Sequence, residues 1–367
     1  MTVGEKMQSQ EAKYMAVVNW VMEQIQSGVF KTGDKLPSEN ELSREFELSR
    51  QTVRHAIDVL EQKNMLTRIR GSGTYLGVGN REVRKDRYQN IAVISTYVDS
   101  YIFPPVLKGI EKTLSKAGYT MQVAFTGNRI EKEGEILDKL LKKGFIDGLI
   151  VEPAKSALPN PNLDSYRRLA KRQLPVLFFN SSYPQLPFPC VALHDELVAR
   201  KAVEYLIRAG HRRIGGIFKC DDGQGHLRYL GFVKAMKQAG FGIDRRGIVW
   251  IDSESQNDLE SWSDYLFDRL KDCTALVCYN DEVAYMLSGI CMKRGILIPE
   301  DLSLVSIDNS ELASLGEVPI TSYPHPMEAL GKKAAENMIR MIENPYFDGN
   351  YLFDSEAVER DSVRVRV

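Results

Sequence analysis

The sequence predicts an α/β protein with a small, mainly helical N-terminal unit and a larger two-lobed unit built from doubly wound parallel sheets. The length of 367 residues argues for two or more domains, because single cores rarely exceed about 250–300 residues. Near residue 80 the pattern changes from amphipathic helices to short apolar runs that alternate with helical segments. The polar stretch GVGNREVRKDRYQ at 77–89 lies at this change and is typical of a linker. We therefore expect domains at 1–78 and 90–367, joined by a linker at 79–89.

Composition excludes several classes of protein. Hydrophobic and charged contents of 43% and 26% are those of a soluble globular chain, and the net charge of −1 indicates neither a nucleic acid nor a membrane as a bulk partner. The N-terminus lacks the apolar core of a signal peptide, and no run approaches the ~20 apolar residues of a membrane span. We expect a cytoplasmic protein. The five cysteines contain no C-x-x-C pair and the histidines do not cluster with them, so we expect free thiols, no metal site and no cofactor.

Eight short apolar runs in the larger unit predict buried strands. They are IAVIS (91–95), MQVAF (121–125), DGLIVE (147–152), PVLFF (175–179), IGGIF (214–218), GIVWI (247–251), ALVCY (275–279) and LSLVSI (302–307). Helical periodicity lies between them, for example at 106–118, 195–210, 228–240 and 281–295, and each of these segments ends in Gly. This alternation predicts βαβ units in two lobes, with a ligand where the carboxyl ends of the strands meet.

The N-terminal unit shows three amphipathic helices with clear start signals. Residues 12–28 place an apolar stripe on one helical face, made of Met15, Val18, Val21, Met22 and Ile25. Ser38 and Glu41 form a capping box, S-x-x-E, that starts a short helix ending near Phe46. Ser49 caps the next helix, whose inward stripe is Val53, Ile57 and Leu60.

The opposite face of this last helix carries Arg50, Gln51, Arg54 and His55. Two short helices joined by a tight turn make a helix-turn-helix, which places the start of its second helix at base edges in the DNA major groove. Arg can make two hydrogen bonds to guanine and Gln can make two to adenine, while Thr52 and Arg54 suit a phosphate or a base edge. The pattern therefore predicts a recognition helix.

A basic hairpin follows the recognition helix. MLTRI and TYL flank RGSG, and the stretch from Asn64 to Leu76 contains Arg68 and Arg70 but no acidic residue. Such a wing can bring backbone N–H groups and positive charge to phosphates. The competing interpretation is a small helical domain with a solvated Arg face. The two caps, the inward stripe and the basic hairpin together favour DNA binding.

Residues 33–76 resemble the winged helix-turn-helix domain of the GntR family of bacterial regulators, in the stretch GDKLPSENELSREFELSRQTVRHAIDVLEQKNMLTRIRGSGTYL. The resemblance implies binding to double-stranded operator DNA. The candidate DNA-binding residues, from the pattern and the resemblance together, are Lys13, Ser38, Asn40, Ser49, Arg50, Gln51, Thr52, Arg54, Arg68, Arg70 and Gly71.

Residues 90–367 resemble the sugar-responsive domain of the LacI/GalR family, with signposts in HRRIGGIF (211–218), CYNDEVAYML (278–287) and IPEDLSLVSIDNS (298–310). A GntR-type head on such a domain is similar to the AraR-type, arabinose-responsive repressors of Gram-positive bacteria. The resemblance implies L-arabinose as the effector. One recognition helix covers only a half-site, so we expect a homodimer on a palindromic operator.

The resemblance also implies a set of effector-binding residues, nearly all of which follow a predicted strand. The set is Tyr101, Phe103, Glu152, Lys155, Asn180, Lys219, Asp221, Gln224, Arg228, Asn280, Asp281, Asp308 and His325. Phe103 is expected to flank the sugar ring, and Arg228, expected to open a helix, to clamp ring hydroxyls. His325 stands where ribose-type relatives commonly have Gln.

Simpler interpretations exist for several of these residues. Asp281 is also explained as the N-cap of the helix that it precedes. Lys219 and Asp221 are also explained as a solvated turn, and Tyr101 as a core residue. Asp222 follows the same strand as Lys219 and belongs to the same candidate cluster.

Other functional classes fit less well. The sequence has no G-x-S-x-G elbow, P-loop or metal constellation, so we expect no enzyme. A transport binding protein needs an export signal and has no use for a DNA-binding head. The remaining alternative is a regulator of the same kind that responds to a different sugar or small metabolite. We expect a repressor that leaves its operator when a sugar binds.

Overall fold

The computed structural model describes residues 3–27, 29–30, 33–62, 65–69, 71–77, 87–99, 101–345 and 347–366. The chain forms two compact units, one of Met1–Arg87 with Arg340–Asp348 and one of Tyr88–Ile339 with Gly349–Val367. The boundary after Arg87 falls within the expected linker 79–89, of which 79–86 lie outside the described residues.

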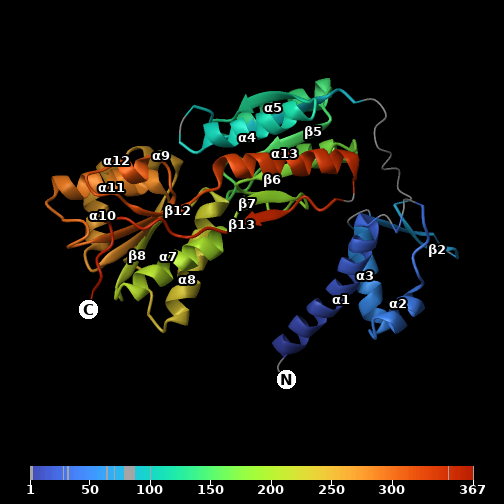
Figure 1. Ribbon diagram of the computed structural model, residues 1–367, viewed down its shortest axis with the longest axis horizontal. Helices are drawn as coiled ribbons and strands as arrows, with labels where there is room; N and C mark the ends of the chain where they lie inside the picture. The colour runs from blue at the N-terminus through green and yellow to red at the C-terminus, as the bar shows by residue number, and fades with distance from the viewer. Residues whose placement is uncertain are drawn as a thin grey trace. The chain divides into compact units, whose positions relative to one another are not determined.

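The first unit is a winged helix-turn-helix. Its helices are α1 (Val3–Gln26), α2 (Glu39–Glu45) and α3 (Arg50–Gln62), and its strands are β1 (Leu66–Ile69) and β2 (Gly73–Leu76), as Figure 1 shows. The strands pair antiparallel, Leu66 opposite Leu76 and Ile69 opposite Gly73. Gly71 takes a φ of 78° in the turn between them, a conformation that glycine adopts without strain. The expected recognition helix and wing are both present.

Both expected helix caps in this unit are formed. Ser38 Oγ accepts from Glu41 N at 3.3 Å and Glu41 Oε2 accepts from Ser38 N at 2.7 Å, which completes the capping box. Ser49 Oγ accepts from Thr52 N at 3.1 Å at the start of α3.

The core of this unit confirms the inward stripe of α3 and shifts that of α1. Val53, Ile57 and Leu60 are buried. Met15 is 38% exposed, so its place on the inward stripe was wrong. The ring of Tyr14 instead meets His55 edge-on at 4.6 Å, which turns position 14 toward α3 and position 15 away from it.

The second unit has two lobes, each a parallel sheet between helices (Figure 1). Lobe 1 has the strand order β13-β7-β6-β5-β3-β4 and lobe 2 the order β12-β11-β10-β8-β9. The lobe 1 strands are β3 (Asn90–Ser95), β4 (Thr120–Phe125), β5 (Gly148–Val151), β6 (Val176–Phe179), β7 (Cys190–Leu193) and β13 (Tyr351–Phe353). The lobe 2 strands are β8 (Ile214–Lys219), β9 (Ile248–Ile251), β10 (Ala275–Cys278), β11 (Ser303–Asp308) and β12 (Thr321–Pro324).

Helices connect these strands. Lobe 1 holds α4 (Phe103–Lys116), α5 (Ile130–Lys143), α6 (Leu163–Lys171) and α13 (Met327–Glu343); lobe 2 holds α7 (Asp195–Arg208), α8 (Gly223–Gln238), α9 (Ser253–Asn257), the 3-10 helix η1 (Leu259–Trp262), α10 (Ser263–Leu270), α11 (Asp281–Lys293) and α12 (Leu312–Leu315). Helices α4 and α13 cross backbone to backbone, because a Cβ on Gly109 would lie 2.2 Å from Glu328 O and one on Gly331 2.0 Å from Val106 O. A side chain at either glycine would push these helices apart.

The chain passes between the lobes three times, so neither lobe is a continuous segment. It enters lobe 2 between β7 and α7, returns to lobe 1 between β12 and α13, and leaves again after β13. In the last segment Val358 and Ser322 exchange backbone hydrogen bonds of 2.9 and 3.2 Å, and Leu304 N donates to Ser362 O at 2.9 Å. Both lobes therefore depend on residues that follow α13.

The eight expected strands are confirmed, and three strands were missed, β7, β12 and β13. Two helix starts were placed too late. The first begins at Phe103 rather than 106, and α8 begins at Gly223 rather than 228, so Arg228 lies inside its helix and does not open it. None of the helices in the described part of the chain is long and apolar enough to cross a membrane. All five cysteines are free, and no His, Cys, Asp and Glu side chains of the described residues gather into a metal-binding group.

Candidate functional site

The candidate DNA surface is formed by the exposed face of α3 and the start of α2. Arg50, Gln51 and Arg54 are exposed there, as the sequence predicted. Ser38 and Asn40 are exposed at the start of α2, Ser49 before α3, Lys13 on α1 and Gly71 in the wing turn. Arg70 lies outside the described residues, so its phosphate contact stays a prediction.

Thr52 differs from its neighbours on α3. It is only 9% exposed, and its Oγ1 lies 2.8 Å from Ser49 Oγ. The hydroxyl therefore takes part in the cap of α3, and its expected contact with DNA stays a prediction that needs a rearrangement of this pair.

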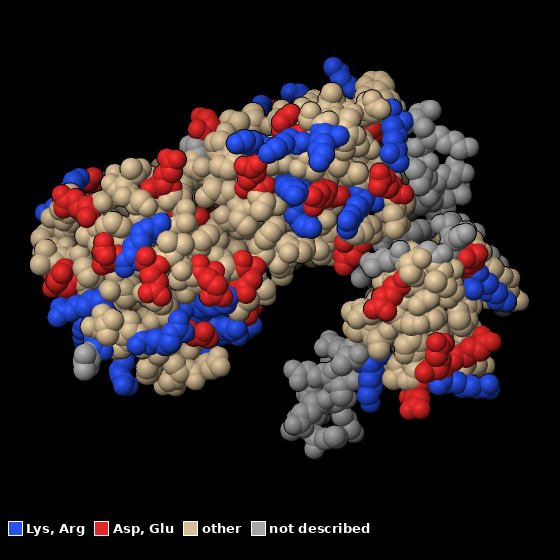
Figure 2. Space-filling model, viewed as in Figure 1, with Lys and Arg blue, Asp and Glu red and all other residues tan. Residues whose placement is uncertain are grey.

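Two arginines of the first unit, Arg54 and Arg68, are already paired with carboxylates. Arg54 makes a forked ion pair with Glu39, with Nη2 at 2.8 Å and Nε at 3.2 Å. Arg68 Nη1 lies 2.6 Å from Asp58 Oδ1 and 3.4 Å from Glu61 Oε2. The wing itself lacks acidic residues, but α2 and α3 supply them, and Figure 2 shows acidic side chains among the basic ones on the visible face of this unit. DNA phosphates must compete with these carboxylates for Arg54 and Arg68.

A cavity of about 180 Å³ lies between the two lobes of the second unit. This volume is below the ~300–1,000 Å³ of sites for drug-sized ligands, so the cavity suits a small molecule. Eight of the expected effector-binding residues line it, together with Asp222: Tyr101, Phe103, Glu152, Lys219, Gln224, Arg228, Asn280 and Asp308. The strand-end argument therefore located the cavity.

Arg228 lies at the centre of the buried polar groups around this cavity and is 1% exposed. Its Nε donates to Asp195 Oδ1 at 2.7 Å, its Nη1 to Tyr279 O at 2.5 Å and its Nη2 to Asp308 Oδ1 at 3.4 Å. Burial opposes the charge on Arg228, but the carboxylates of Asp195 and Asp308 outweigh it and raise the pKa of the guanidinium. Burial raises the pKa of Asp308 to about 7, although Arg228 pulls it down.

Glu152 and Lys219 are two further ionisable residues at the cavity wall. Burial raises the pKa of Glu152, although Asn180 Nδ2 donates to Glu152 Oε1 at 2.7 Å and Thr96 N donates to Oε2 at 2.9 Å. Lys219 Nζ lies 2.8 Å from Asp222 Oδ2. Lys219 is 6% exposed, so its interpretation as a solvated turn was wrong.

Five expected effector residues are not among those that line the cavity: Lys155, Asn180, Asp221, Asp281 and His325. Asn180 Oδ1 lies 3.1 Å from His325 Nε2, and this pair joins the lobes where the chain crosses between them. Burial, with Arg228 nearby, lowers the pKa of His325 to about 3, so its ring is neutral.

Asp281 is fully buried and holds lobe 2 together. It accepts from the hydroxyls of Ser306, Ser310 and Ser322, while the N-cap of α11 is Asn280, whose Oδ1 accepts from Val283 N at 3.0 Å. The alternative that Asp281 is the cap was therefore wrong by one residue. Direct contact between Asp281 and an effector stays a prediction, one that its existing bonds oppose.

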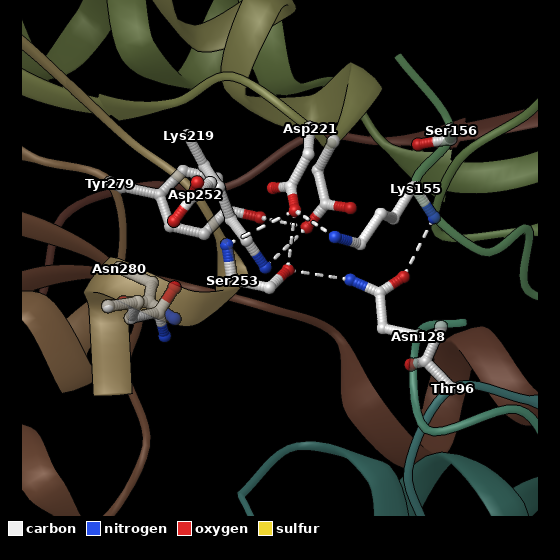
Figure 3. A network of polar contacts seen from close by, with 12 residues as sticks. Thr96, Asn128, Lys155, Ser156, Lys219, Asp221, Asp252, Ser253, Tyr279 and Asn280 are labelled. Atoms are coloured by element: carbon white, nitrogen blue, oxygen red, sulfur yellow. Dashed lines mark hydrogen bonds and ion pairs between the residues drawn. The ribbon is translucent and has the colours of Figure 1, made fainter. Parts of the chain in front are cut away.

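Lys155 and Asp221 belong to a rim of contacts that joins the two lobes (Figure 3). Lys155 Nζ lies 3.7 Å from Asp221 Oδ2 and 2.9 Å from Glu254 Oε1. Asn128 Nδ2 donates to Ser253 Oγ at 2.8 Å, and Ser253 Oγ donates in turn to Asp221 Oδ2 at 2.7 Å. We call Asn128, Lys155, Asp221 and Ser253 the rim latch.

Tyr101 joins the lobes from inside the cavity. Its hydroxyl donates to Asp308 Oδ2 at 2.5 Å and accepts from Asp281 N at 3.2 Å. Tyr101 is thus both a lining residue and a bridge, rather than a core residue of one lobe.

Backbone strain also marks this region. Tyr101, Lys155, Asn180 and Asp308 have φ values of 59°, 43°, 60° and 113°, in a range that non-glycine residues rarely adopt. Such residues gather at functional sites, where the surrounding contacts hold them in place.

Several lining residues were missed by the sequence analysis, among them Ser253, Gln256 and Glu282. Ser253 comes two residues after β9, so the rule applied to the other strand ends would have found it, whereas Gln256 lies further on, inside α9. Glu282 follows Asn280 and Asp281, which were selected, but its own position in the first turn of α11 carries no motif.

Comparison with known proteins agrees with this architecture. Residues 13–76 match bacterial regulatory proteins of the gntR family, and residues 203–363 match a periplasmic binding protein-like domain. The transcription regulator CcpA of Lactococcus lactis has a similar fold, with a TM-score of 0.67 and 23% identity over 75% of this chain and 99% of that one.

Two relatives are similar over nearly the whole chain. The arabinose metabolism transcriptional repressor of Geobacillus stearothermophilus is 36% identical over 358 residues, which are 96% of this chain and 98% of the relative. The protein of the same description from Halalkalibacterium halodurans is 36% identical over 338 residues, 91% of this chain and 90% of the relative. The chain therefore belongs to the family of arabinose metabolism transcriptional repressors, DNA-binding regulators with a gntR-type head and a periplasmic binding protein-like domain.

Proposed function

We propose that the protein represses sugar-utilisation genes and leaves its operator when L-arabinose binds between the lobes. The observation that carries this proposal is the cavity, whose wall combines carboxylates, amides and a guanidinium with the ring of Phe103. Sugars present hydroxyls at their edges and C–H groups on their faces, so such a wall can pair with both. A site that pairs hydroxyls rejects analogues that lack them, because its own polar groups are then left without partners.

The charges around the cavity favour an uncharged sugar over a sugar phosphate. The lining carboxylates are Glu152, Asp222, Glu282 and Asp308, and the lining cations are Lys219 and Arg228. Both cations already pair with carboxylates, Lys219 with Asp222 and Arg228 with Asp195 and Asp308. A phosphate is bound by cations that are available to it, and in the described wall none is.

The proposed working form is a homodimer in the cytoplasm. Two heads are needed to read two operator half-sites. On lobe 2, exposed apolar side chains of Tyr285, Met292, Leu297 and Leu315 surround a groove of about 600 Å³. A second copy that covers this groove would remove apolar surface from water and bring two heads together.

Sugar and operator must be coupled through the conformation of the dimer. A sugar that favours closed lobes weakens DNA binding only if the closed form holds the heads in a less favourable arrangement, and by linkage DNA then weakens sugar binding equally. A typical coupling of ~1–3 kcal/mol corresponds to about 5–150-fold in operator affinity.

We infer no catalytic role for the cavity, and turnover of L-arabinose by the purified protein would contradict this.

The direct test combines two measurements on the full chain. A thermal-shift screen of pentoses, hexoses and their phosphates should show L-arabinose raising the melting temperature, because a ligand at about 100 times its Kd stabilises the native state by ~2.7 kcal/mol. Operator binding should then weaken at saturating L-arabinose. If L-arabinose fails and another sugar succeeds, the alternative effector holds; if operator affinity is unchanged at saturating sugar, the release mechanism is wrong.

A further inference from the structure

We propose that Glu282 determines which sugar the cavity accepts, by taking a hydrogen bond from one ligand hydroxyl with its Oε1 oxygen. This rests on the proposed function, because it takes the ligand to be a sugar. Glu282 lines the cavity from the first turn of α11. An acidic residue at that position is often only a complement to the helix dipole, so its surroundings decide the question.

Two amides fix the carboxylate of Glu282. Gln256 Nε2 donates to Glu282 Oε2 at 2.9 Å, and Asn280 Nδ2 donates to the same oxygen at 3.2 Å. The amide of Asn280 is itself fixed, because its Oδ1 caps α11 through Val283 N. Gln256 is 8% exposed and reaches Glu282 from α9, so a side chain from another element holds this carboxylate in place.

The other oxygen of Glu282 is not engaged in this way. No hydrogen bond or ion pair from the described residues reaches Glu282 Oε1, although the side chain is only partly exposed. Burial raises the pKa of Glu282, while the hydrogen bonds from Asn280 and Gln256 lower it. A carboxylate oxygen at a cavity wall is a strong acceptor for a hydroxyl donor.

Gln256 and Asn280 are positioning residues in this arrangement. Both donate to the same oxygen of Glu282 and so leave the same acceptor turned to the ligand. A hydroxyl placed one ring carbon away, or with the opposite configuration, would leave this carboxylate without its partner. Discrimination of this kind exceeds what apolar contacts provide.

The test is a double-mutant cycle between Glu282→Gln and the hydroxyls of the sugar, measured by calorimetry on the full chain. Wild type and variant are titrated with L-arabinose and with each monodeoxy analogue. We expect Glu282→Gln to weaken L-arabinose binding by roughly 10–100-fold, the range for a hydrogen bond to a charged group. For one monodeoxy analogue, wild type and variant should bind about equally, because the partner hydroxyl is already missing.

Matched variants separate this role from folding. Glu254→Gln changes a carboxylate of the same region that does not line the cavity, and it should not couple to any hydroxyl. Gln256→Leu should weaken binding through the same hydroxyl as Glu282→Gln, since it frees the carboxylate to turn. Operator binding without sugar should be unchanged in each variant.

Three outcomes overturn the inference. If Glu282→Gln binds L-arabinose as wild type does, the residue does not touch the ligand. If the variant loses the same factor with every analogue, Glu282 has only a structural role. If wild type binds no sugar at all, the proposed function falls and this inference with it.

Discussion

Replacing Lys155 by Met should weaken sugar binding by opening the rim latch, without direct loss of a ligand contact. The side chain of Asp221 is 3% exposed, and with Lys155 removed the contacts that its carboxylate keeps with the described residues are the hydrogen bonds from Ser253 N at 3.1 Å and Ser253 Oγ at 2.7 Å. Removing one partner of a fully buried ion pair costs ~3–5 kcal/mol. The 3.7 Å separation from Asp221 is beyond hydrogen-bond length, so we expect a smaller cost of about 1–2 kcal/mol to the closed form.

Lys155 and Asp221 belong to different lobes, so this cost falls only on the form in which the rim latch is made, which we call the closed form. At 1.4 kcal/mol for each tenfold change, L-arabinose affinity should fall by about 5–30-fold. The assay is calorimetric titration of the full chain, with operator affinity in the absence of sugar as the measure of an intact head.

Glu254→Gln is the matched control for Lys155→Met. The side chain of Glu254 is 71% exposed, and its 2.9 Å contact with Lys155 is a surface ion pair worth at most about 1 kcal/mol. Its effect on sugar affinity should stay below about 5-fold. If Glu254→Gln equals Lys155→Met, the exposed pair and not Asp221 is responsible, and if neither variant changes sugar affinity, the latch does not set the closing equilibrium.

Three further predictions follow from the described contacts. Arg228→Ala should lower the free energy of unfolding of the lobes by ~3–5 kcal/mol, because it leaves Asp195 and Asp308 buried without their cation. Urea unfolding measures this loss, and a value below about 1 kcal/mol would contradict the pairing. The pKa of Asp308 is about 7 in the native state and ~3.9 in the unfolded state, so ionisation of Asp308 lowers the free energy of unfolding as the pH rises between these values. Between pH 5 and pH 7 wild type should therefore lose about 2 kcal/mol of stability relative to Asp308→Asn. Parallel stability curves for the two proteins over this pH range would refute the prediction. Arg50→Ala should cost ~1–3 kcal/mol of discrimination between operator and mismatched DNA if Arg50 reads a base, whereas equal loss on all DNA in a binding assay would assign it to phosphate.

Local sequence signals predicted the head well. The capping box of Ser38 and Glu41 and the stripe of Val53, Ile57 and Leu60 depend on neighbours in the sequence, and the structure confirms both. The error at Met15 arose because Tyr14 and Met15 are both large and largely apolar, so the sequence pattern does not decide which of the two faces the core. The ion pairs of Arg54 and Arg68 were missed because their partners come from other elements.

In the second unit, the eight longer apolar runs were predicted as strands, and three strands of three or four residues were missed, including the apolar CVAL of β7. TSYP (321–324) is polar and pairs with the preceding strand β11, while YLF (351–353) is short and pairs with the distant strand β7. α8 begins at Gly223 after the N-cap residue Asp222, whose side chain makes no capping hydrogen bond, and its first turn, GQGH, contains two glycines, which are poor helix formers. Tertiary contacts, which the local pattern does not contain, decided these elements.

At the site, the location of the cavity was predictable from the sequence, but the contacts that each polar side chain makes were not. The ends of the strands located the cavity, since that rule depends only on topology. The rule cannot tell Asp308, which lines the cavity, from Asp281, which three serine hydroxyls hold in the interior of lobe 2. That distinction depends on which groups each carboxylate already meets.

The three passages of the chain between the lobes bear on the order in which the regulator becomes active during synthesis. Chains emerge from the ribosome N-terminus first, and domains generally fold as units as they appear. The head, which ends with β2, can fold while the lobes are still incomplete, since lobe 1 awaits β13 and lobe 2 awaits Val358 and Ser362. A nascent head without finished lobes has no partner head and binds DNA only weakly. Under the proposed dimer, each molecule therefore acquires high operator affinity and the response to sugar at the same time.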